Sequence, residues 1–483
     1  MSAESLLERA RALLARTTTF YRDVPRTATW LRERLERLDQ PLRIAVSGQV
    51  KAGKSTLINA LVGTELAPAD AAERTQVPTL YRYGPEPKVL VHTPHGTVQN
   101  APVSTVDAAT VRDLQHWRPD EVARLVVESP TPGLQAISLI ETPGVASAAV
   151  RETGRSALAQ VLSEADAVLY LTRHPHQTDV QFLQSIHELQ IARRAPINTI
   201  IAFSRADEAG SGAEALGTAE RIADRYRADP TVRSFTQHVI PVVGLLGQAA
   251  ATMTDEEFTA LARLATLSEA DQEALLLSTD RFTRSTAPES VPAGTRAALL
   301  GRFGSFGVER ALAALRGGVR EPGRLRTELL EQSGLTALQE AVHRQFVERQ
   351  EALRARSALL GVDMVLRANP RPGSKQLRGE FERLMANAHD WDELRLLSAL
   401  DSGQVRFPRP LQAEAKRLLG TAGPDRRSRL GRDAHSSDQD VADDALAAVH
   451  RWRDQLVNPL HDRAHRDAVR TVLRTCEQLL VNP

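Results

Sequence analysis

The sequence predicts an α/β domain with a doubly wound, mostly parallel sheet, extended by a helical region to which both ends of the chain contribute. Two observations support this fold class. Short apolar runs typical of strands alternate with helical segments from about residue 41 to residue 250, which is the pattern of a sheet covered by helices. After about residue 250 no convincing strand appears, whereas helical apolar stripes continue to the C-terminus.

The first 40 residues predict a helix, or a broken helix, with one apolar face. Its stripe is interrupted at Pro25 and resumes at Trp30. A lone amphipathic helix is marginal in water, so this face must pack on another part of the chain. The positions that share it before the interruption are Leu6, Ala10, Leu13, Leu14 and Thr17.

The α/β part begins with a strand at Leu42–Val46, a glycine-rich turn and a helix at Ser55–Leu61. Apolar runs predict seven further strands, with helical segments between several of them. These strands are Thr79–Arg82, Lys88–His92, Arg124–Glu128, Leu134–Ile140, Ala167–Thr172, Asn198–Phe203 and His238–Val243.

The remainder predicts helices with glycine and proline punctuation between them. Thr421–Asp440 is rich in Gly, Ser, Asp and Arg and predicts an exposed or disordered loop. The helical segments are 255–300, 308–316, 335–366, 376–400, 410–419 and two more within 441–481.

Composition excludes several classes of protein. The formal net charge is +1, so any contact with nucleic acid or a membrane needs a local patch. Only five of the 61 basic residues are lysines, a bias that indicates a GC-rich genome, yet Lys51 and Lys54 share one loop. The single cysteine, Cys476, excludes an internal disulfide, and with no signal-type segment we expect a cytoplasmic protein that does not thread a bilayer.

A phosphate-binding loop lies between the first strand and the following helix. Its sequence matches G-x-x-x-x-G-K-[ST] in full and in the required context. The glycines let backbone amides wrap round phosphate, and the helix start adds its positive dipole end. Lys54 is predicted to neutralise the β- and γ-phosphates and Ser55 to ligate Mg²⁺. The predicted nucleotide-binding residues here are Gly48, Gln49, Val50, Lys51, Ala52, Gly53, Lys54, Ser55 and Thr56.

Two later segments predict contacts with Mg²⁺ and the γ-phosphate. Thr75 lies about 20 residues past the loop, and its hydroxyl is expected to close on both, although a lone loop threonine is a weak signal. Glu141-Thr142-Pro143-Gly144 follows a predicted strand. Glu141 is expected to hold a magnesium-bound water, and the Gly144 amide to sense the γ-phosphate.

Two further segments predict recognition of the base. The Asp207 carboxylate, in Ser204-Arg205-Ala206-Asp207, can accept hydrogen bonds from N1–H and N2–H₂ of guanine, a pattern that adenine does not offer. Arg205 is expected to lie along the base and ribose. Val243-Gly244 follows the next strand and would present an amide to guanine O6. The order and spacing of all five segments favour GTP, with GDP as product, over ATP.

Two departures from the usual GTPase pattern bear on the rate. Glu141 stands where aspartate is usual, and the added methylene predicts indirect or loose contact with Mg²⁺. Ser204-Arg205 stands where Asn/Thr-Lys is usual, and arginine can cover the base with its stem as lysine does. No glutamine follows Gly144 at the position that small GTPases use to orient the attacking water.

Ile44–Pro68 resembles the phosphate-loop region of bacterial dynamin-like GTPases, and Thr75 with Pro78 resembles their second motif. Other segments are similar to the isoniazid-inducible dynamin-like proteins of mycobacteria, the shorter of the two in particular. The resemblance runs from about residue 20 to the C-terminus. These other segments are Ser204–Glu208, Pro241–Leu246, Arg302–Gly307 and Ser333–Leu335.

The resemblance implies a P-loop GTPase (G) domain with helical insertions over 41–350 and an α-helical neck bundle built from both termini. An N-terminal neck helix would span 1–40, and residues 351–483 would form the rest of the neck or a short trunk. The apolar faces of 4–39, 345–366 and 441–481 need partners, and we expect them to pack on one another.

The resemblance also implies nucleotide-dependent dimerisation through G domains and work on membranes as a peripheral protein at the inner face of the cell membrane. A second dynamin-like protein is a further implied partner. Only about 130 residues follow Gln350, and no hydrophobic paddle is evident.

Lys51 departs from the fast dynamins, which carry a serine at this position that helps to hold a monovalent cation. We hypothesise that its ammonium supplies the positive charge itself and stabilises the β–γ bridging oxygen. The alternative is that Lys51 points to solvent or to an acidic partner.

Two features suggest membrane contact, each with a structural alternative. A basic cluster predicts either a patch for anionic lipid or a solvated loop. Phe303 and Phe306, between glycines, predict either a membrane wedge or anchors buried under neighbouring helices. The basic cluster comprises Lys416, Arg417, Arg426, Arg427, Arg429 and Arg432.

The sequence therefore predicts a GTPase that remodels membranes. A rival hypothesis is a weakly active GTP-binding regulator of a second dynamin-like protein. A GTPase acting on RNA is disfavoured by the neutral net charge and the lack of an RNA-binding module, so no nucleic-acid partner is expected.

Overall fold

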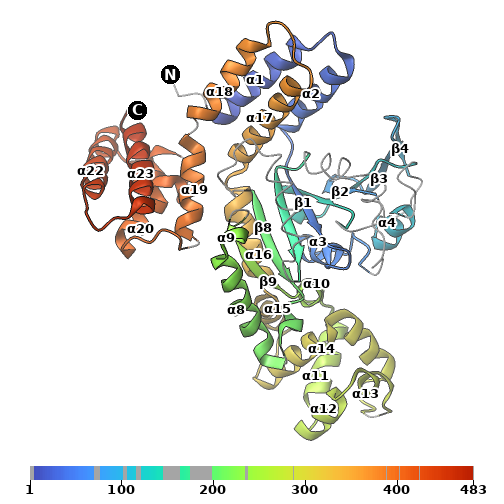
Figure 1. The fold of residues 1–483 in the computed structure, drawn as a ribbon. Helices are drawn as coiled ribbons and strands as arrows, with labels where there is room; N and C mark the ends of the chain where they lie inside the picture. The colour runs from blue at the N-terminus through green and yellow to red at the C-terminus, as the bar shows by residue number, and fades with distance from the viewer. Residues whose placement is uncertain are drawn as a thin grey trace. The chain divides into compact units, whose positions relative to one another are not determined.

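The computed structural model describes residues 5–481, except for 70–76, 102–105, 116–120, 145–163, 174–197, 211, 234–235, 237, 287, 388, 402, 424 and 434. The chain forms two compact units, shown as a ribbon in Figure 1. Of the described residues, the sheet unit comprises those within 41–173 and 198–349, and the helical unit comprises those within 5–40 and 350–481.

The described strands of the sheet unit form one sheet in the order β4-β3-β5-β2-β6-β1-β7-β8-β9. Strands β6, β1, β7, β8 and β9 run parallel, and β2, β3 and β4 supply the antiparallel pairings. The predicted doubly wound, mostly parallel sheet is confirmed. The strands are β1 Leu42–Gly48, β2 Thr79–Tyr83, β3 Lys88–His92, β4 Val98–Asn100, β5 Arg124–Ser129, β6 Ile137–Glu141, β7 Ala167–Thr172, β8 Thr199–Ser204 and β9 Val239–Val242.

Strand β1 lies between β6 and β7 and is buried along its whole length. The apolar run of this strand fits that position, because a central parallel strand is covered on both faces. After β1 the chain builds the side of the sheet that holds β2 to β6, and then continues with β7 on the other side of β1, so the strand order reverses at β1. Ligands of such sheets bind outside the carboxyl ends of the strands at this reversal.

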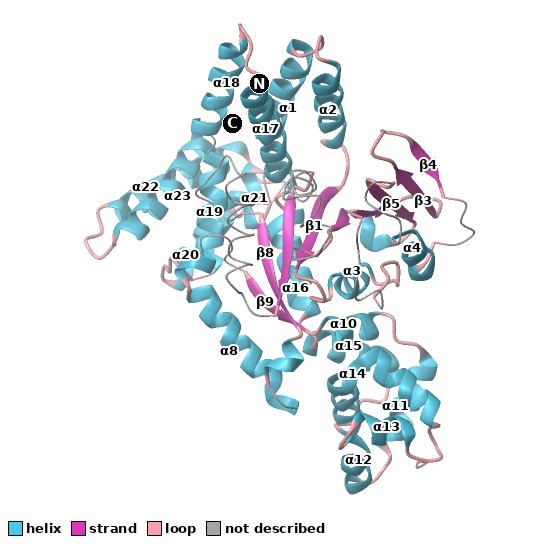
Figure 2. Cartoon of the chain, turned by 45° about the vertical axis from the view of Figure 1, so that its right-hand side comes forward, coloured by secondary structure: helices cyan, strands magenta, loops and turns pink. Residues whose placement is uncertain are grey.

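Helix α8 packs on β9, α3 packs on β1 and β6, and α10 packs on α3 (Figure 2). The helical segments predicted at 255–300 and 308–316 correspond to helices α11 to α14. Helix α14 spans the gap between the two predicted segments, with a kink at Gly304 (φ 67°). The helices of this unit are α3 Lys54–Val62, α4 Ala108–Gln115, α8 Ala215–Ala228, α9 Pro230–Arg233, α10 Gly244–Ala251, α11 Asp255–Ala265, α12 Glu269–Leu276, α13 Thr279–Arg284, α14 Ala293–Arg316, α15 Pro322–Gln332 and α16 Leu335–Val342.

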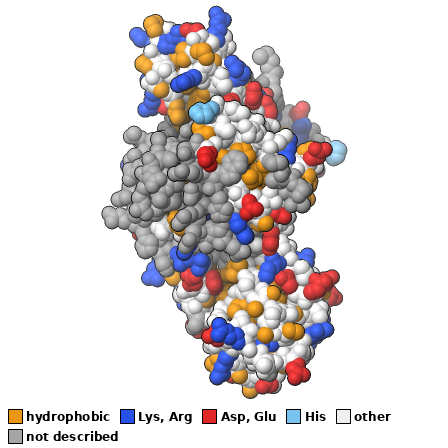
Figure 3. All heavy atoms as spheres, turned by 90° about the vertical axis from the view of Figure 1, so that its right-hand side faces the viewer, with side chains coloured by type: hydrophobic (Ala, Val, Ile, Leu, Met, Phe, Trp, Pro, Cys, Tyr) orange, Lys and Arg blue, Asp and Glu red, His pale blue; other side chains and the backbone are white. Residues whose placement is uncertain are grey.

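The surface of the α11–α14 region carries side chains of both charges, interspersed with isolated apolar ones, on the face shown in Figure 3. Phe303 and Phe306 are not part of that surface, since they are only 1% and 7% exposed. They pack in the core of the sheet unit. Of the two predictions for this pair, buried anchors are therefore correct and a membrane wedge is wrong.

The N-terminal helices pack on α17 and α18 in the helical unit. Leu13 and Leu31 share one apolar cluster with Leu359 and Val362, and the Tyr21 hydroxyl donates to the carbonyl of Asn369 (2.6 Å). The predicted pairing of 4–39 with 345–366 is thus present. The elements are α1 Leu6–Phe20, α2 Pro25–Arg37, α17 Gln350–Ala368 and α18 Ser374–Asn387.

The last helices form a second apolar cluster around Trp452 and Cys476. The expectation that 441–481 packs on 4–39 and 345–366 is wrong, because α22 and α23 form a hairpin and cover each other together with α19–α21. Figure 1 shows α22 and α23 side by side. The elements are α19 His389–Asp401, α20 Arg409–Lys416, α21 Arg426–Leu430, α22 Asp438–Leu456 and α23 Arg463–Val481.

The loop predicted at Thr421–Asp440 instead contains helix α21. Asp425 caps this helix by accepting a hydrogen bond from the Ser428 amide (3.0 Å), and Gly431 ends it in the left-handed conformation (φ 77°). Leu430 is buried in the second cluster. One apolar side chain therefore anchors a segment whose composition favoured disorder.

Candidate nucleotide-binding site

The predicted phosphate loop connects β1 to α3. Gly48 leaves the strand with φ 152°, and a Cβ there would lie 2.3 Å from the Leu171 carbonyl oxygen. Gly53 (φ 91°) then caps α3. Lys51 is also left-handed, with φ 64°, a conformation that side chains other than glycine disfavour. The loop therefore turns tightly in front of the helix start, as the motif predicts.

Lys54 is buried at the first position of α3, and its Nζ donates to the Gln49 carbonyl (3.1 Å). Burial lowers the pKa of Lys54 below its ordinary value, and the charge of Glu141 opposes part of that shift. A desolvated ammonium inside a loop of backbone amides is suited to bind an anion. This geometry fits the β- and γ-phosphates of a nucleotide.

Ser55 and Glu141 are in direct contact. The Ser55 hydroxyl donates to Glu141 Oε1 (2.5 Å), and the Tyr81 hydroxyl lies 3.3 Å from Glu141 Oε2. The Glu141 side chain is only 1% exposed and comes from the end of β6, beside Val46 of β1. Tyr81 was not predicted, because its contact with Glu141 depends on strand pairing that the sequence does not display.

The oxygens of Ser55 and Glu141 suit a hard cation such as Mg²⁺. Among the described residues no group of three or more His, Cys, Asp or Glu side chains could hold a metal. In the predicted site, phosphate oxygens of the nucleotide would join these two residues around the ion. Thr75, the third predicted ligand, lies outside the described residues.

Gly144 lies against the phosphate loop. A Cβ on Gly144 would be 2.5 Å from Val50 Cγ2 and 3.0 Å from the Val50 amide nitrogen, so only glycine permits this approach. Thr142 holds the segment to β1, since its amide donates to the Val46 carbonyl (3.1 Å). The structure thus brings Gly144 to the loop, where its amide was predicted to act.

The predicted base loop follows β8. Ser204 is buried, and its hydroxyl has no hydrogen-bond partner in the described part of the chain. Arg205 is left-handed (φ 54°) and pairs with Glu208 (2.8 Å). Burial raises the pKa of the half-buried Asp207, and the charge of Glu208 raises it further, while Arg205 and Arg173 lower it.

Val243 and Gly244 join β9 to α10. A Cβ on Gly244 would be 3.7 Å from Thr56 Cγ2, so this turn lies close to the start of α3. The Val243 amide donates to the Ser333 carbonyl (2.8 Å), which leaves the Gly244 amide as the candidate donor to guanine. Gly334 (φ 73°) packs directly on the Pro241 carbonyl, and this contact explains the Ser333–Leu335 motif as support for the turn.

Arg173 is a site residue that sequence reasoning missed. It follows β7, and its Nη2 donates to the Lys51 carbonyl (3.4 Å), while its Nη1 lies 3.7 Å from Glu208 Oε2. Its position directly after a predicted strand could have indicated a site residue. The carboxyl ends of parallel strands lie at one edge of the sheet, where ligands bind.

The basic cluster of the helical unit is not an open patch. Four of its six members form ion pairs within that unit, which removes most of the charge available to a lipid surface. These pairs are Lys416–Asp401 (2.7 Å), Arg427–Asp438 (2.5 Å), Arg429–Glu393 (3.0 Å) and Arg432–Asp444 (2.5 Å).

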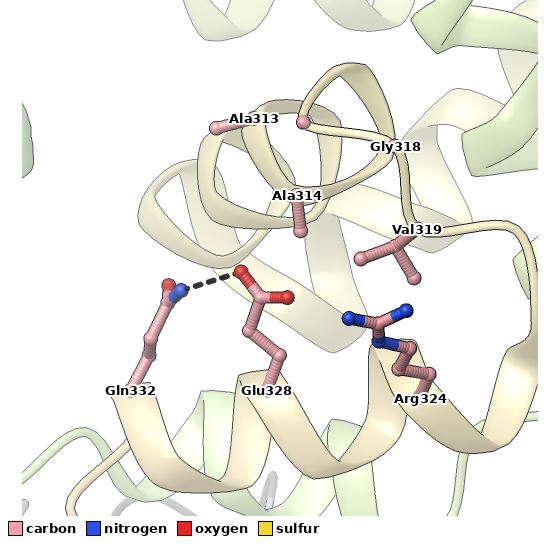
Figure 4. Close-up of a pocket in the computed structure, with 8 residues that line it drawn as sticks. Ala313, Ala314, Gly318, Val319, Arg324, Glu328 and Gln332 are labelled. Carbon is pink, nitrogen blue, oxygen red and sulfur yellow. Dashed lines mark hydrogen bonds between the residues drawn. The ribbon is translucent and has the colours of Figure 1, made fainter.

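A cavity of about 310 Å³ lies between α14 and α15, outside the predicted site. Small residues of α14 form one wall, and Arg324, Glu328 and Gln332 extend from α15 on the other side (Figure 4). Gln332 donates to Glu328 (3.3 Å). Glu328 supplies a single carboxylate to the lining, and it accepts from Gln332; we assign this cavity no role.

Comparison with known proteins gives a consistent result. The pattern of the dynamin family matches residues 44–201. The chain is 35% identical over 491 aligned residues to the isoniazid-induced protein IniC of Mycobacterium tuberculosis, covering 99% of this chain and 98% of that protein. It is 38% identical to the bacterial dynamin-like protein of Nostoc punctiforme over 114 residues, covering 21% of this chain and 16% of that protein.

One solved structure is also similar. It belongs to an oligomerised bacterial dynamin pair that is described as a mechanism for the long-range sensing and tethering of membranes. The match covers 99% of this chain and 80% of that chain, at 14% identity and a TM-score of 0.33. This likeness is too distant to bear on function.

Proposed function

The chain belongs to the dynamin family and is a GTPase, and we propose that it couples GTP hydrolysis at the 48–55 loop to G-domain dimerisation and membrane remodelling. The observation that carries this proposal is the convergence of phosphate loop, Glu141 and Asp207 at the carboxyl edge of parallel strands. The sheet unit would act as the G domain, and α1, α2, α17 and α18 as the neck.

Each part of the site has a task in this proposal. Lys54 and the loop amides bind the β- and γ-phosphates, and Asp207 accepts from guanine N1–H and N2–H₂. Ser55 and Glu141 would hold Mg²⁺ together with the phosphates, and the ion would neutralise charge that develops on the phosphate oxygens. Gly144, against Val50, would report the γ-phosphate to the segment that follows it.

We assign Lys51 the role of an internal positive charge at the β–γ bridging oxygen. Support comes from its left-handed backbone (φ 64°) in the phosphate loop, its exposed side chain and the contact of its carbonyl with Arg173. An ammonium placed there would favour charge that develops on the leaving group. The alternative, that Lys51 serves an acidic partner, predicts no effect on turnover by the isolated protein.

Membrane contact would be peripheral, at the inner face of the cell membrane. None of the helices described by the structure combines the length and apolarity needed to cross a bilayer. With the basic cluster ion-paired, the turn between α22 and α23 is the better candidate, because Val457 and Leu460 are 80% and 89% exposed there. Paired apolar tips of this kind can enter the headgroup region.

The rival function is a weakly active GTP-binding regulator that assembles with a second dynamin-like protein. The direct Ser55–Glu141 hydrogen bond favours it, because the Mg²⁺-binding hydroxyl is already engaged. The chain is also 30% identical over 188 residues to the isoniazid-induced protein IniA of M. tuberculosis, covering 37% of this chain and 28% of that protein. A dynamin-like protein of this kind from the same cell would be the partner that the rival function needs.

GTP turnover and sedimentation of the isolated protein discriminate the two functions. The GTPase proposal predicts turnover that rises with liposomes and a dimer that forms with GTP and a transition-state mimic but not with GDP. Tight GTP binding with near-zero turnover, unchanged by liposomes, would favour the regulator. A protein that stays monomeric in every nucleotide state would contradict the proposed dimerisation.

A further inference from the structure

A chain of polar contacts links the phosphate loop to the base loop. The Lys51 carbonyl accepts from Arg173 Nη2 (3.4 Å), and Arg173 Nη1 faces Glu208 Oε2 (3.7 Å). The other oxygen of Glu208 accepts from Arg205 Nη1 (2.8 Å). Arg173 itself comes from a third element, the end of β7.

The two residues at the ends of this series of contacts share an unusual backbone conformation. Lys51 (φ 64°) and Arg205 (φ 54°) are the non-glycine residues with positive φ in the described part of the chain. Left-handed backbone is disfavoured for such residues, so it persists where the surroundings hold it, commonly at functional sites. The contacts through Arg173 and Glu208 are interactions of that kind.

Arginine suits the bridging position. Its planar guanidinium carries donors on two separate nitrogens, so one end can reach the Lys51 carbonyl while the other faces a carboxylate. The sheet supports this reach, because β7 pairs with β1 through Leu171 and Gly48, directly before Arg173 and the phosphate loop. A lysine would offer one point charge in place of the two-ended contact.

We propose that Arg173 is a positioning residue for GTP hydrolysis: anchored by Glu208 of the base loop, it holds the Lys51 peptide in the left-handed conformation that the hydrolysis step uses. The inference rests on the proposed function of the 48–55 loop. It does not require that the Lys51 side chain acts, because Arg173 contacts the main-chain carbonyl.

The test compares GTP turnover by Arg173→Ala with a matched control, Arg344→Ala, which removes an exposed arginine paired with Glu340 (2.9 Å) away from the site. We expect kcat of R173A to fall roughly fivefold, the size of one partly exposed charged contact, with GDP affinity and Tm close to those of R344A. We expect R173K to recover less than half of the loss. A kcat within twofold of wild type for R173A, or an equal loss in R344A, would overturn the proposal.

Glu208→Gln provides a second route if R173A fails to fold. It leaves Arg173 and Lys51 intact and should lower kcat in the same direction, and the R173A/E208Q double variant should be no slower than the slower single variant. Additive losses would contradict a shared bridge. Failure of the proposed function can be told apart from failure of the Arg173 proposal, because the wild type would then show no GTP turnover. Failure of the proposed Lys51 charge alone would show as unchanged turnover in K51A.

Discussion

The Ser55 hydroxyl donates a 2.5 Å hydrogen bond to Glu141 Oε1 in the candidate magnesium site. Aspartate at position 141 would stop one methylene short of this contact, leaving space for a water molecule between carboxylate and hydroxyl. Glutamate occupies that space itself, and the Tyr81 hydroxyl steadies its other oxygen at 3.3 Å. The departure at position 141 thus has a geometric consequence, since in the proposed site Ser55 would exchange this bond for Mg²⁺ on nucleotide binding.

Substitution of Glu141 tests that consequence. Glu141→Ala should lower Mg²⁺-dependent turnover about 10- to 100-fold, as loss of a carboxylate beside a metal ligand does elsewhere. Glu141→Asp should reach half-maximal turnover at a lower Mg²⁺ concentration than wild type, because Ser55 is released. Titration of GTP turnover with Mg²⁺ measures both. A Mg²⁺ requirement unchanged in E141D would mean that the Ser55–Glu141 bond does not limit metal binding.

Asp207 predicts how GTP affinity depends on pH. Burial and Glu208 raise the pKa of Asp207 above its ordinary value of 3.8, and only the ionised carboxylate accepts both guanine donors. GTP affinity should therefore be full above this raised pKa and should be lost as the pH falls through it, beginning at a higher pH than for an unperturbed aspartate. Fluorescent-GDP titrations at a series of pH values test this, and Glu208→Gln, which removes the like charge, should move the acid limb to lower pH.

Asp207→Asn should change which purine base the site prefers. The variant replaces one acceptor by a donor, so it should lose at least about 100-fold in GTP affinity, since polar groups at the base are left unpaired. Xanthosine triphosphate offers a carbonyl in place of the guanine amine, and we expect it to bind D207N more tightly than GTP does. Equal affinities of D207N and wild type for GTP would show that Asp207 does not read the base.

Lys51→Ala tests the internal charge. If the ammonium replaces a monovalent cation, K51A should lose about tenfold or more in kcat, and K⁺ should restore more activity to K51A than it adds to wild type. Turnover should be compared in K⁺ and in choline buffers at matched ionic strength. Unchanged turnover in both buffers would contradict the catalytic role and would favour the alternative that the Lys51 side chain points to solvent or to an acidic partner.

The α22–α23 turn predicts where lipid contact occurs. Val457→Asp with Leu460→Asp should weaken binding to anionic liposomes at least about tenfold, because two apolar side chains lose their burial. Leu446→Asp, at a 45% exposed position of α22 outside the turn, is the matched control and should bind like wild type. Basal GTP turnover without liposomes should be the same in all three proteins. Equal liposome binding by all three proteins would show that the α22–α23 turn is not the site of lipid contact.

The regular parts of the molecule were readable from sequence because their signals are local. Strand β1, buried on both faces, shows a continuous apolar run, and the phosphate loop is a contiguous motif placed between a strand and a helix. Strand β4 was missed, since its three residues, Val98–Asn100, are exposed and carry no pattern. Helix α21 was missed because a single buried side chain, Leu430, outweighs the polar composition around it.

The side-chain contacts at the site were not readable, because they join residues far apart in the chain. Tyr81 meets Glu141 through pairing of β2 with β6, and Arg173 meets Lys51 because β7 lies beside β1. The internal ion pairs that neutralise the basic cluster also depend on helix packing, so charge counted along the sequence suggested a lipid patch that the fold largely removes.

Every role proposed above depends on the binding and hydrolysis of GTP at the 48–55 loop. Release of phosphate from GTP and from ATP by the purified full-length protein with Mg²⁺, beside Lys54→Ala, tests it most directly. We expect GTP to be the preferred substrate, and we expect K54A to lose at least about 100-fold in turnover while its Tm without nucleotide is not lowered. Turnover by K54A equal to that of the wild type, or an equal rate with ATP, would contradict it.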